Sequence, residues 1–245
     1  MRTSALPVDP YAALDAGSFS KVPVLIGVNH DEGRFFSQFA ADWTSEAYSQ
    51  VMGDIFGDLA DQALVVYPFD GYASPYNAAY AIGAVFTDGA FMGNIGGCPN
   101  PDLAQVLSTR TRTYFYQFDD RHAPPLTTNL PGFDWGAAHA MELAYMWPSF
   151  YYEAPLAPQF TPGQRQLSRE MVRYWGAFAS VGAPSVSNQP DWPPYRSGQI
   201  MSLRPGGASV LISAAEYGAE HHCDFWRSLH SGATPGKGTK TWRHP

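Results

Sequence analysis

The sequence contains little cysteine, little charge and no long apolar run. Two cysteines among 245 residues exclude a small fold held together by several disulfides. Charged residues make up 15% of the chain, below the roughly one quarter usual in globular proteins, whereas 45% of the residues are hydrophobic. This balance excludes a disordered chain or a coiled coil, and it is enough for a sizeable core in one or two domains.

Clustered positive charge is also lacking, which bears on the partners of the chain. The formal net charge is −7, and the lysines and arginines form no cluster beyond a sparse tail at 236–245. We therefore expect no nucleic-acid partner. No apolar run approaches the ~18 to 20 residues that cross a bilayer, so we expect no membrane span. The first 19 residues lack the apolar core of a signal peptide, and the residues alone leave the compartment unknown.

Apolar periodicity and turn residues predict strands that alternate with helices. The run KVPVLIGV at 21–28 is continuous and apolar, which is typical of a central strand buried on both faces of a parallel sheet. A second strand is predicted at 112–118, and a hairpin around RPGG at 199–213. The order of elements indicates an α/β fold. Helices are predicted at 45–56, 76–92, 102–110, 162–181 and 214–230, followed by a disordered tail at 231–245.

Two Ser/Thr-Pro pairs predict where helices begin. Ser74–Pro75 and Thr161–Pro162 each combine a capping hydroxyl with a proline suited to the first helical turn. Behind the second pair, apolar residues at i, i+4, i+7, i+8 and i+11 form one helix face: Leu167, Met171, Tyr174, Trp175 and Phe178.

The predicted sheet is too small for this amount of helix. It contains only two strands and a hairpin, whereas the apolar run at 22–28 needs neighbouring strands on both sides. The pattern indicates that part of the sheet lies outside this sequence.

Polar residues that can carry chemistry follow the two parallel strands. Asp31 and Glu32 come directly after the first strand, with Gly33 to allow a sharp turn, and His139 follows the second strand. A carboxylate in such a place often only caps a helix, and most single histidines are surface or core residues. An acid followed by a histidine nevertheless matches the last two members of the Ser…Asp/Glu…His order of hydrolases. Asp31 and Glu32 are both candidates for the acid.

Two segments resemble signatures of the type-B carboxylesterase family, the α/β-hydrolases that include cholinesterases and bacterial para-nitrobenzyl-type esterases. They are VPVLIGVNHDEGRFF at 22–36 and GAAHAMELAYMW at 136–147. The resemblance implies that Glu32 is the triad acid and His139 the general base, with a small ester as substrate and no cofactor. Segments at 89–108, 174–185, 191–195 and 221–226 resemble later parts of the family in the right order. The similarity extends to about residue 230, so residues 1–230 are expected to form the C-terminal portion of an α/β-hydrolase domain.

The sequence departs from the family pattern in one respect that affects function. It contains no G-x-S-x-G nucleophile motif and no His-Gly-Gly oxyanion segment, and Ser18, Ser197 and Ser231 next to glycines lie in polar loop or tail contexts. The chain therefore resembles only the C-terminal half of such an enzyme, is expected to be inactive alone, and needs the N-terminal half as partner. A non-catalytic, cholinesterase-like binding module is the alternative. A self-contained enzyme with another nucleophile is a third, for which no candidate residue stands out.

Spacing alone does not decide whether Cys98 and Cys223 are paired. The family resemblance implies a disulfide, because both segments match positions that are bridged in some members, and a disulfide favours a secreted or periplasmic protein.

No metal site is expected. Glu142 forms an H-x-x-E pair with His139, but no third ligand is evident, and His221 and His222 are interpreted as surface histidines beside a structural cysteine. Aromatic residues near the two signatures are either core or the lining of an apolar substrate pocket, and two or three of them are expected to face substrate: Phe35, Phe36, Trp135, Tyr145, Trp147 and Phe150.

Overall fold

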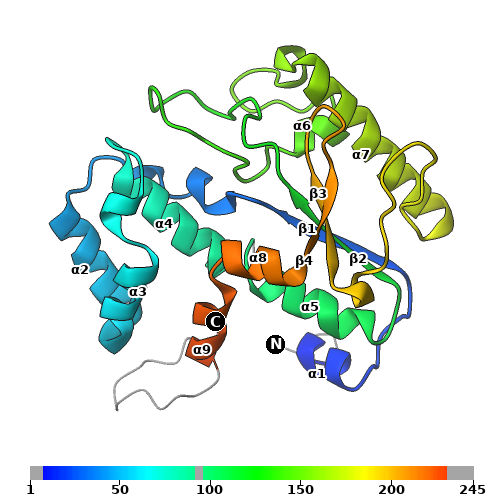
Figure 1. Cartoon of the computed structure of the whole chain (residues 1–245), viewed down its shortest axis with the longest axis horizontal. Helices are drawn as coiled ribbons and strands as arrows, with labels where there is room; N and C mark the ends of the chain where they lie inside the picture. Colours follow the sequence, from blue (N-terminus) through cyan, green and yellow to red (C-terminus); the bar gives the residue numbers. More distant parts are fainter. Residues whose placement is uncertain (1–7, 92–95, 231–245) are drawn as a thin grey trace.

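A four-stranded mixed sheet lies at the centre of the molecule. The computed structural model describes residues 8–91 and 96–230. The first three strands are parallel, and the fourth returns antiparallel to the third, which confirms the predicted α/β fold and hairpin. In spatial order the strands are β1 (Val24–Asn29), β2 (Thr113–Phe118), β3 (Gln199–Leu203) and β4 (Val210–Ser213) (Figure 1).

Helices pack around this sheet, with α2, α3 and α4 gathered to one side of it and α6 and α7 to the other (Figure 1). Short 3₁₀ turns connect several of them, among which η1 (Glu32–Phe35) directly follows β1. The α-helices are α1 (Pro10–Asp15), α2 (Ser45–Phe56), α3 (Ala60–Val66), α4 (Asn77–Asp88), α5 (Pro99–Ser108), α6 (Leu143–Met146), α7 (Pro162–Val181), α8 (Ala214–Glu220) and α9 (Cys223–His230).

Alternation along β2 places α7 and α8 on opposite faces of the sheet. The ring of Tyr116 contacts Trp175 of α7, with centroids 5.0 Å apart. The neighbouring ring of Phe115 contacts Tyr217 of α8 at 6.0 Å. Because successive strand residues point to opposite faces, the core continues on both sides of β2.

The longest helix, α7, forms as its sequence predicts. The hydroxyl of Thr161 accepts a hydrogen bond from the Gln164 backbone, and the Gln164 side chain accepts one from the Thr161 backbone, which makes a capping box. Gly182, with φ +71°, ends the helix in the left-handed conformation. Of the predicted apolar face, Leu167, Met171 and Tyr174 are fully buried, and Trp175 and Phe178 are half-buried.

The start predicted for the helix at 76–92 is wrong. Ser74 does not cap α4, which begins at Asn77 without a side-chain cap. The amide of Asn77 instead donates to the carbonyls of Tyr72 and Phe69, which ties the helix start to the preceding turn. The helix ends at Asp88 because Ala90 adopts a positive φ of 53°; Met92, its predicted end, lies outside the described residues.

The helix predicted at 214–230 is divided into α8 and α9. His222 has a φ of +53°, which no helix interior accommodates. The buried carboxylate of Asp88 binds Nδ1 of His221 at 2.8 Å and Nδ1 of His222 at 2.9 Å, and so holds the chain in this break. The expectation that both are surface histidines is wrong for His221, which is buried.

Strand β1 lies at the edge of the sheet among the described strands, where it pairs with β2 alone. Its first four residues are only half-buried, so the apolar run does not become a central strand here. Gly27 is required by packing, since a Cβ at this position would lie 2.2 Å from the ring of Tyr116. Among the described strands, β1 therefore has one unpaired side, where the sequence pattern predicts a further neighbouring strand.

A disulfide joins Cys98, just before α5, to Cys223, the first residue of α9. It closes a loop of 125 residues, for which the loop-entropy model gives a stabilisation of about 4 to 5 kcal/mol. In the part of the chain that the structure describes, no helix is both long and apolar enough to span a bilayer.

Candidate active site

The structure brings Glu32 and His139 together. Glu32 is the first residue of η1, and His139 lies in the loop between β2 and α6. Nδ1 of His139 is 2.8 Å from Oε2 of Glu32, and 9% of the Glu32 side chain is exposed against 33% of the His139 side chain. The arrangement is a buried carboxylate that holds one nitrogen of a partly exposed histidine.

Sheet geometry explains why two residues so far apart in sequence meet. β1 and β2 are parallel and in register, so that Asn29 lies opposite Phe118 and both strands end at one edge. After β1 the chain turns tightly against α4. A Cβ on Gly33 would lie 2.0 Å from the carbonyl oxygen of Gly83, so only glycine allows this approach.

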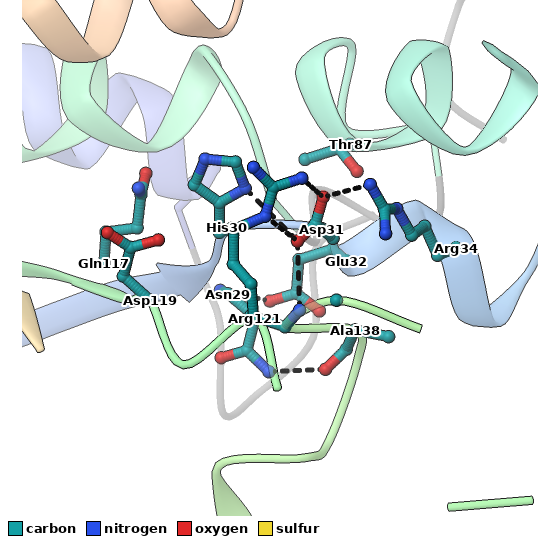
Figure 2. Close-up of polar contacts among 12 residues, drawn as sticks. Asn29, His30, Asp31, Glu32, Arg34, Thr87, Gln117, Asp119, Arg121 and Ala138 are labelled. Atoms are coloured by element: carbon teal, nitrogen blue, oxygen red, sulfur yellow. Dashed lines mark hydrogen bonds and ion pairs between the residues drawn. The ribbon is translucent and has the colours of Figure 1, made fainter. Parts of the chain in front are cut away.

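Asn29 links the carboxylate to the histidine loop. Its backbone N–H donates to Oε1 of Glu32 at 2.8 Å, so both oxygens of that carboxylate are held. Its side-chain amide donates to the carbonyl of Ala138 at 2.8 Å and to Oε2 of Glu142 at 2.5 Å. Figure 2 shows the Asn29 side chain reaching the Ala138 carbonyl. The orientation of Glu32 therefore depends on a hydrogen-bonded frame, not on one contact.

Asp31, the rival acid, holds the same loop from another side. Its side chain accepts a hydrogen bond from the Ala137 backbone N–H at 3.0 Å, and it pairs with Arg34 at 3.2 Å and Arg121 at 3.1 Å (Figure 2). Gly136 has a φ of +59°, and a Cβ there would lie 2.3 Å from Oδ2 of Asp31. Asp31 thus fastens the loop while Glu32 contacts the histidine.

The charges of the site favour a basic histidine. The hydrogen bond with Glu32 is the main cause that raises the pKa of His139; burial opposes it, and the charges of Glu32 and Glu142 add to it. Burial raises the pKa of Glu142. Burial also disfavours an ionised Asp31, but His30, Arg34 and Arg121 outweigh burial and hold the pKa of Asp31 well below its usual range.

Two of the aromatic residues near the signatures lie beside His139, and most of the others belong to the core. Phe36 and Phe35 have ring centroids 4.9 and 6.3 Å from that of His139. Tyr152, which the sequence did not single out, packs edge-on against Phe35 at 5.9 Å. Of the remaining four, Trp135 and Tyr145 are buried in the core, Phe150 is half-buried against it, and Trp147 is 56% exposed.

The residues that hold the site together were not predicted from the sequence. The polar residue at the end of β1, Asn29, and the glycine at 136 both stand in the two signatures, but no role was assigned to them. No sequence motif marks Arg121, because its role depends on hydrogen bonds with Asp31, which is 90 residues away in the sequence. Residues 139–142 form a turn before the short α6, so His139 and Glu142 of the H-x-x-E pair do not lie on one helix face.

No nucleophile lies against the histidine in the described part of the chain. No serine, threonine or cysteine there forms a hydrogen bond with His139, and both cysteines are joined to each other. Ser18 and Ser197 are exposed, and Ser197 donates to the carbonyl of Pro194; Ser231 lies outside the described residues.

The fold and the pair of side chains define the class of the protein. A carboxylate and a histidine at the ends of neighbouring parallel strands, in this chain order, are arranged as in an α/β-hydrolase. A family model described as the carboxylesterase family matches residues 2–226, and the chain belongs to this family.

Similar proteins are esterases of greater length. The chain is 28% identical to an acetylcholinesterase of Leptinotarsa decemlineata over 214 residues, which cover 79% of this chain and 31% of that protein. It is 26% identical over 241 residues to a human cocaine esterase, covering 91% of this chain and 40% of the relative.

Solved structures give the same fold. Aspergillus niger EstA matches with a TM-score of 0.65 at 22% identity over 91% of this chain and 43% of that one. A thermophilic PNB esterase matches with a TM-score of 0.60 at 24% identity over 88% of this chain and 41% of that one. The chain therefore spans roughly a third to two fifths of the length of these proteins.

Proposed function

We propose that this chain supplies the acid and the general base of a serine carboxylesterase, with Glu32 as the acid and His139 as the base. The observation that carries the proposal is the 2.8 Å contact between the Glu32 carboxylate and Nδ1 of His139. The contact favours the tautomer with hydrogen on Nδ1, which leaves the lone pair on Nε2 for a substrate-side proton. Nε2 has no hydrogen-bond partner among the described residues.

Each residue has a defined part in the proposed reaction. His139 takes the proton of the serine as the serine oxygen attacks the ester carbonyl, and Glu32 stabilises the resulting imidazolium. His139 then gives this proton to the departing alcohol, and in the second half-reaction it activates water in the same way. The raised pKa of His139 suits it to this exchange. The reaction needs no metal or cofactor.

The nucleophile and the oxyanion hole belong to polypeptide outside this sequence in the proposed enzyme. Support comes from the lack of a G-x-S-x-G motif and from the length of the relatives, of which the chain covers 31 to 43%. The half-buried edge strand β1 offers a place for further strands. The substrate is a small ester, whose apolar part would rest against Phe35 and Phe36 beside His139.

A non-catalytic binding module is the second candidate, since the chain alone lacks a nucleophile. The geometry of the dyad argues against it, because a binding module has no need to bury a carboxylate against a partly exposed histidine. The disulfide favours an oxidising location, secreted or periplasmic, for either candidate. Nucleic acid is not a partner in either, in keeping with the net charge of −7.

Hydrolysis of a short-chain nitrophenyl ester tests the proposal. The purified chain is assayed alone and after co-expression with the polypeptide encoded upstream of residue 1, each with a His139→Ala control. We expect no enzymatic turnover by the chain alone, and activity after co-expression that His139→Ala lowers by about 10³-fold or more. Turnover by the chain alone that His139→Ala abolishes would point to a nucleophile within it. Inactivity of both, with no upstream G-x-S-x-G, would favour the binding module.

A further inference from the structure

Three side chains of types that bind metals lie close together next to Asp31. His30 follows β1 directly, Glu220 ends α8, and His221 lies in the break between α8 and α9. Nε2 of His30 is 2.7 Å from Oε1 of Glu220, and the rings of His30 and His221 have centroids 5.3 Å apart. Each of the three residues presents a ligand atom, and these atoms all lie within 4.8 Å of one another.

Both histidines are backed by a buried carboxylate. Nδ1 of His221 is 2.8 Å from Oδ1 of Asp88, and Nδ1 of His30 is 3.3 Å from Oδ2 of Asp31, an ion-pair distance without an aligned hydrogen bond. Figure 2 shows the His30 ring directed toward Asp31. Such a carboxylate orients a histidine ring toward a metal, and Nε2 binds the ion once it has given up its hydrogen. His30 and His221 are 8% and 2% exposed, so their rings are held in place.

The cluster opens on a cavity of about 230 Å³, which has room for the ion and its water. Each of the two arginines in its wall has a carboxylate partner: Arg34 pairs with Asp31 and Asp134, and Arg121 pairs with Asp31. The other charged and titratable groups that face the cavity are Asp31, Asp88, Glu220, His30, His221, His222, Tyr72 and Tyr80.

We propose that His30, Glu220 and His221 form a binding site for one divalent transition-metal ion of the zinc type. Two imidazole nitrogens and one carboxylate oxygen are a common zinc ligand set, with a water in the fourth position. Imidazole does not suit Mg²⁺ or Ca²⁺, which select oxygen ligands. The ligand atoms of a tetrahedral zinc site lie about 3.3 Å apart, so the three atoms, which lie within 4.8 Å of one another, shift slightly as the ion binds. The Glu220 side chain, which is 46% exposed, has the most room to do so.

Binding of the ion exchanges existing contacts for metal bonds. The hydrogen bond between Nε2 of His221 and Oε1 of Gln117, at 2.9 Å, gives way to the ion. The contact between Nε2 of His30 and Oε1 of Glu220, at 2.7 Å, is replaced by bonds from both atoms to the ion.

Calorimetric titration of the purified, chelator-treated chain with zinc chloride at pH 7.5 tests the site, together with the visible absorption spectrum of the Co²⁺ form. We expect one ion per chain and a Co²⁺ spectrum of tetrahedral type. Glu220→Gln and His30→Gln should each weaken binding by about 10- to 100-fold. Glu220→Gln changes a half-exposed side chain, and so keeps the test valid if His30→Gln does not fold. Asp224→Asn, an exposed carboxylate on the adjacent helix, should leave affinity unchanged.

A His139→Ala variant separates this site from the candidate active site. Zinc bound by His139, Glu32 and Glu142 would be lost in His139→Ala and retained in Glu220→Gln, and that result would overturn the proposal. Binding that both variants retain would place the ion on other histidines and overturn it equally. So would the lack of any binding up to about 1 mM zinc.

Discussion

Asp31 and Ala137 exchange two hydrogen bonds between the strand end that carries the proposed acid and the loop that carries the proposed base. The Asp31 backbone N–H donates to the Ala137 carbonyl at 3.0 Å, and the Asp31 carboxylate accepts from the Ala137 N–H at 3.0 Å. His139 is two residues further along this loop. The placement of His139 beside Glu32 therefore depends also on Asp31, which holds the loop that carries the histidine.

Replacement of Asp31 should loosen the dyad without removing either member. Asp31→Asn leaves Arg34 and Arg121 without their shared carboxylate, which should lower the free energy of unfolding by about 2 to 3 kcal/mol. The pKa of His139 should fall toward its ordinary value as the loop moves away from Glu32. Urea unfolding and a histidine NMR titration measure the two effects.

The matched control is Asp119→Asn, which removes the partner of Arg204 at the end of the same sheet. This variant should also lose stability but should leave the pKa of His139 unchanged. An equal shift in both variants would mean that Asp31 acts only through global stability.

Glu32→Gln should lower the pKa of His139, because the hydrogen bond with Glu32 is the largest cause that raises it. A raised pKa in the folded state stabilises the fold below the unfolded pKa of histidine, and this contribution is lost as pH rises through the folded value. The stability difference between the native chain and Glu32→Gln should therefore be largest near pH 5.5 and shrink toward pH 8.5. Unfolding by urea at several pH values measures it; a difference that grows with pH would contradict the assigned pair.

Alanine substitutions at two glycines with similar backbone conformations distinguish the cost of backbone strain from the cost of a steric clash. Gly136 and Gly132 have φ values of +59° and +74°, but a Cβ on Gly136 would lie 2.3 Å from Asp31, whereas one on Gly132 meets nothing within 4 Å. Gly132→Ala should cost about 1 kcal/mol of stability from strain alone. Gly136→Ala should cost at least about 2 kcal/mol more, because Asp31 must move. Equal losses in urea unfolding would show that Asp31 is not tightly held.

Local signals in the sequence were sufficient for much of the fold. The Thr161–Pro162 pair and the RPGG turn each act within a few residues, and the structure has α7 and the hairpin of β3 and β4 where they predict them. The false cap at Ser74 and the unbroken helix at 214–230 have another origin. In both cases contacts outside the local sequence pattern determine the structure. Asn77 binds the preceding turn at the start of α4. Asp88 binds two histidines from the far end of the chain, where the helix is broken.

The candidate site shows the same division. Glu32 and His139 were predicted from their places after two strands and from the family signatures. The side chains that fix them were not, because Asn29, Asp31 and Arg121 act across roughly 90 to 113 residues of sequence. Pairings of this kind follow only from the register of β1 against β2, which the sequence does not specify.

The disulfide gives a final prediction about stability. Cys98 and Cys223 are 2% and 0% exposed, and between them the chain passes through both β2 and the candidate base loop. The double variant Cys98→Ser/Cys223→Ser should lose about 4 to 5 kcal/mol, since its unfolded state regains the entropy of a 125-residue loop. Native chain in excess dithiothreitol should unfold at the same urea concentration as the double variant, because both lack the bond. Non-reduced peptide mapping checks the pairing directly: two alkylatable thiols in chain expressed under oxidising conditions would refute it, and with it the support for an oxidising compartment.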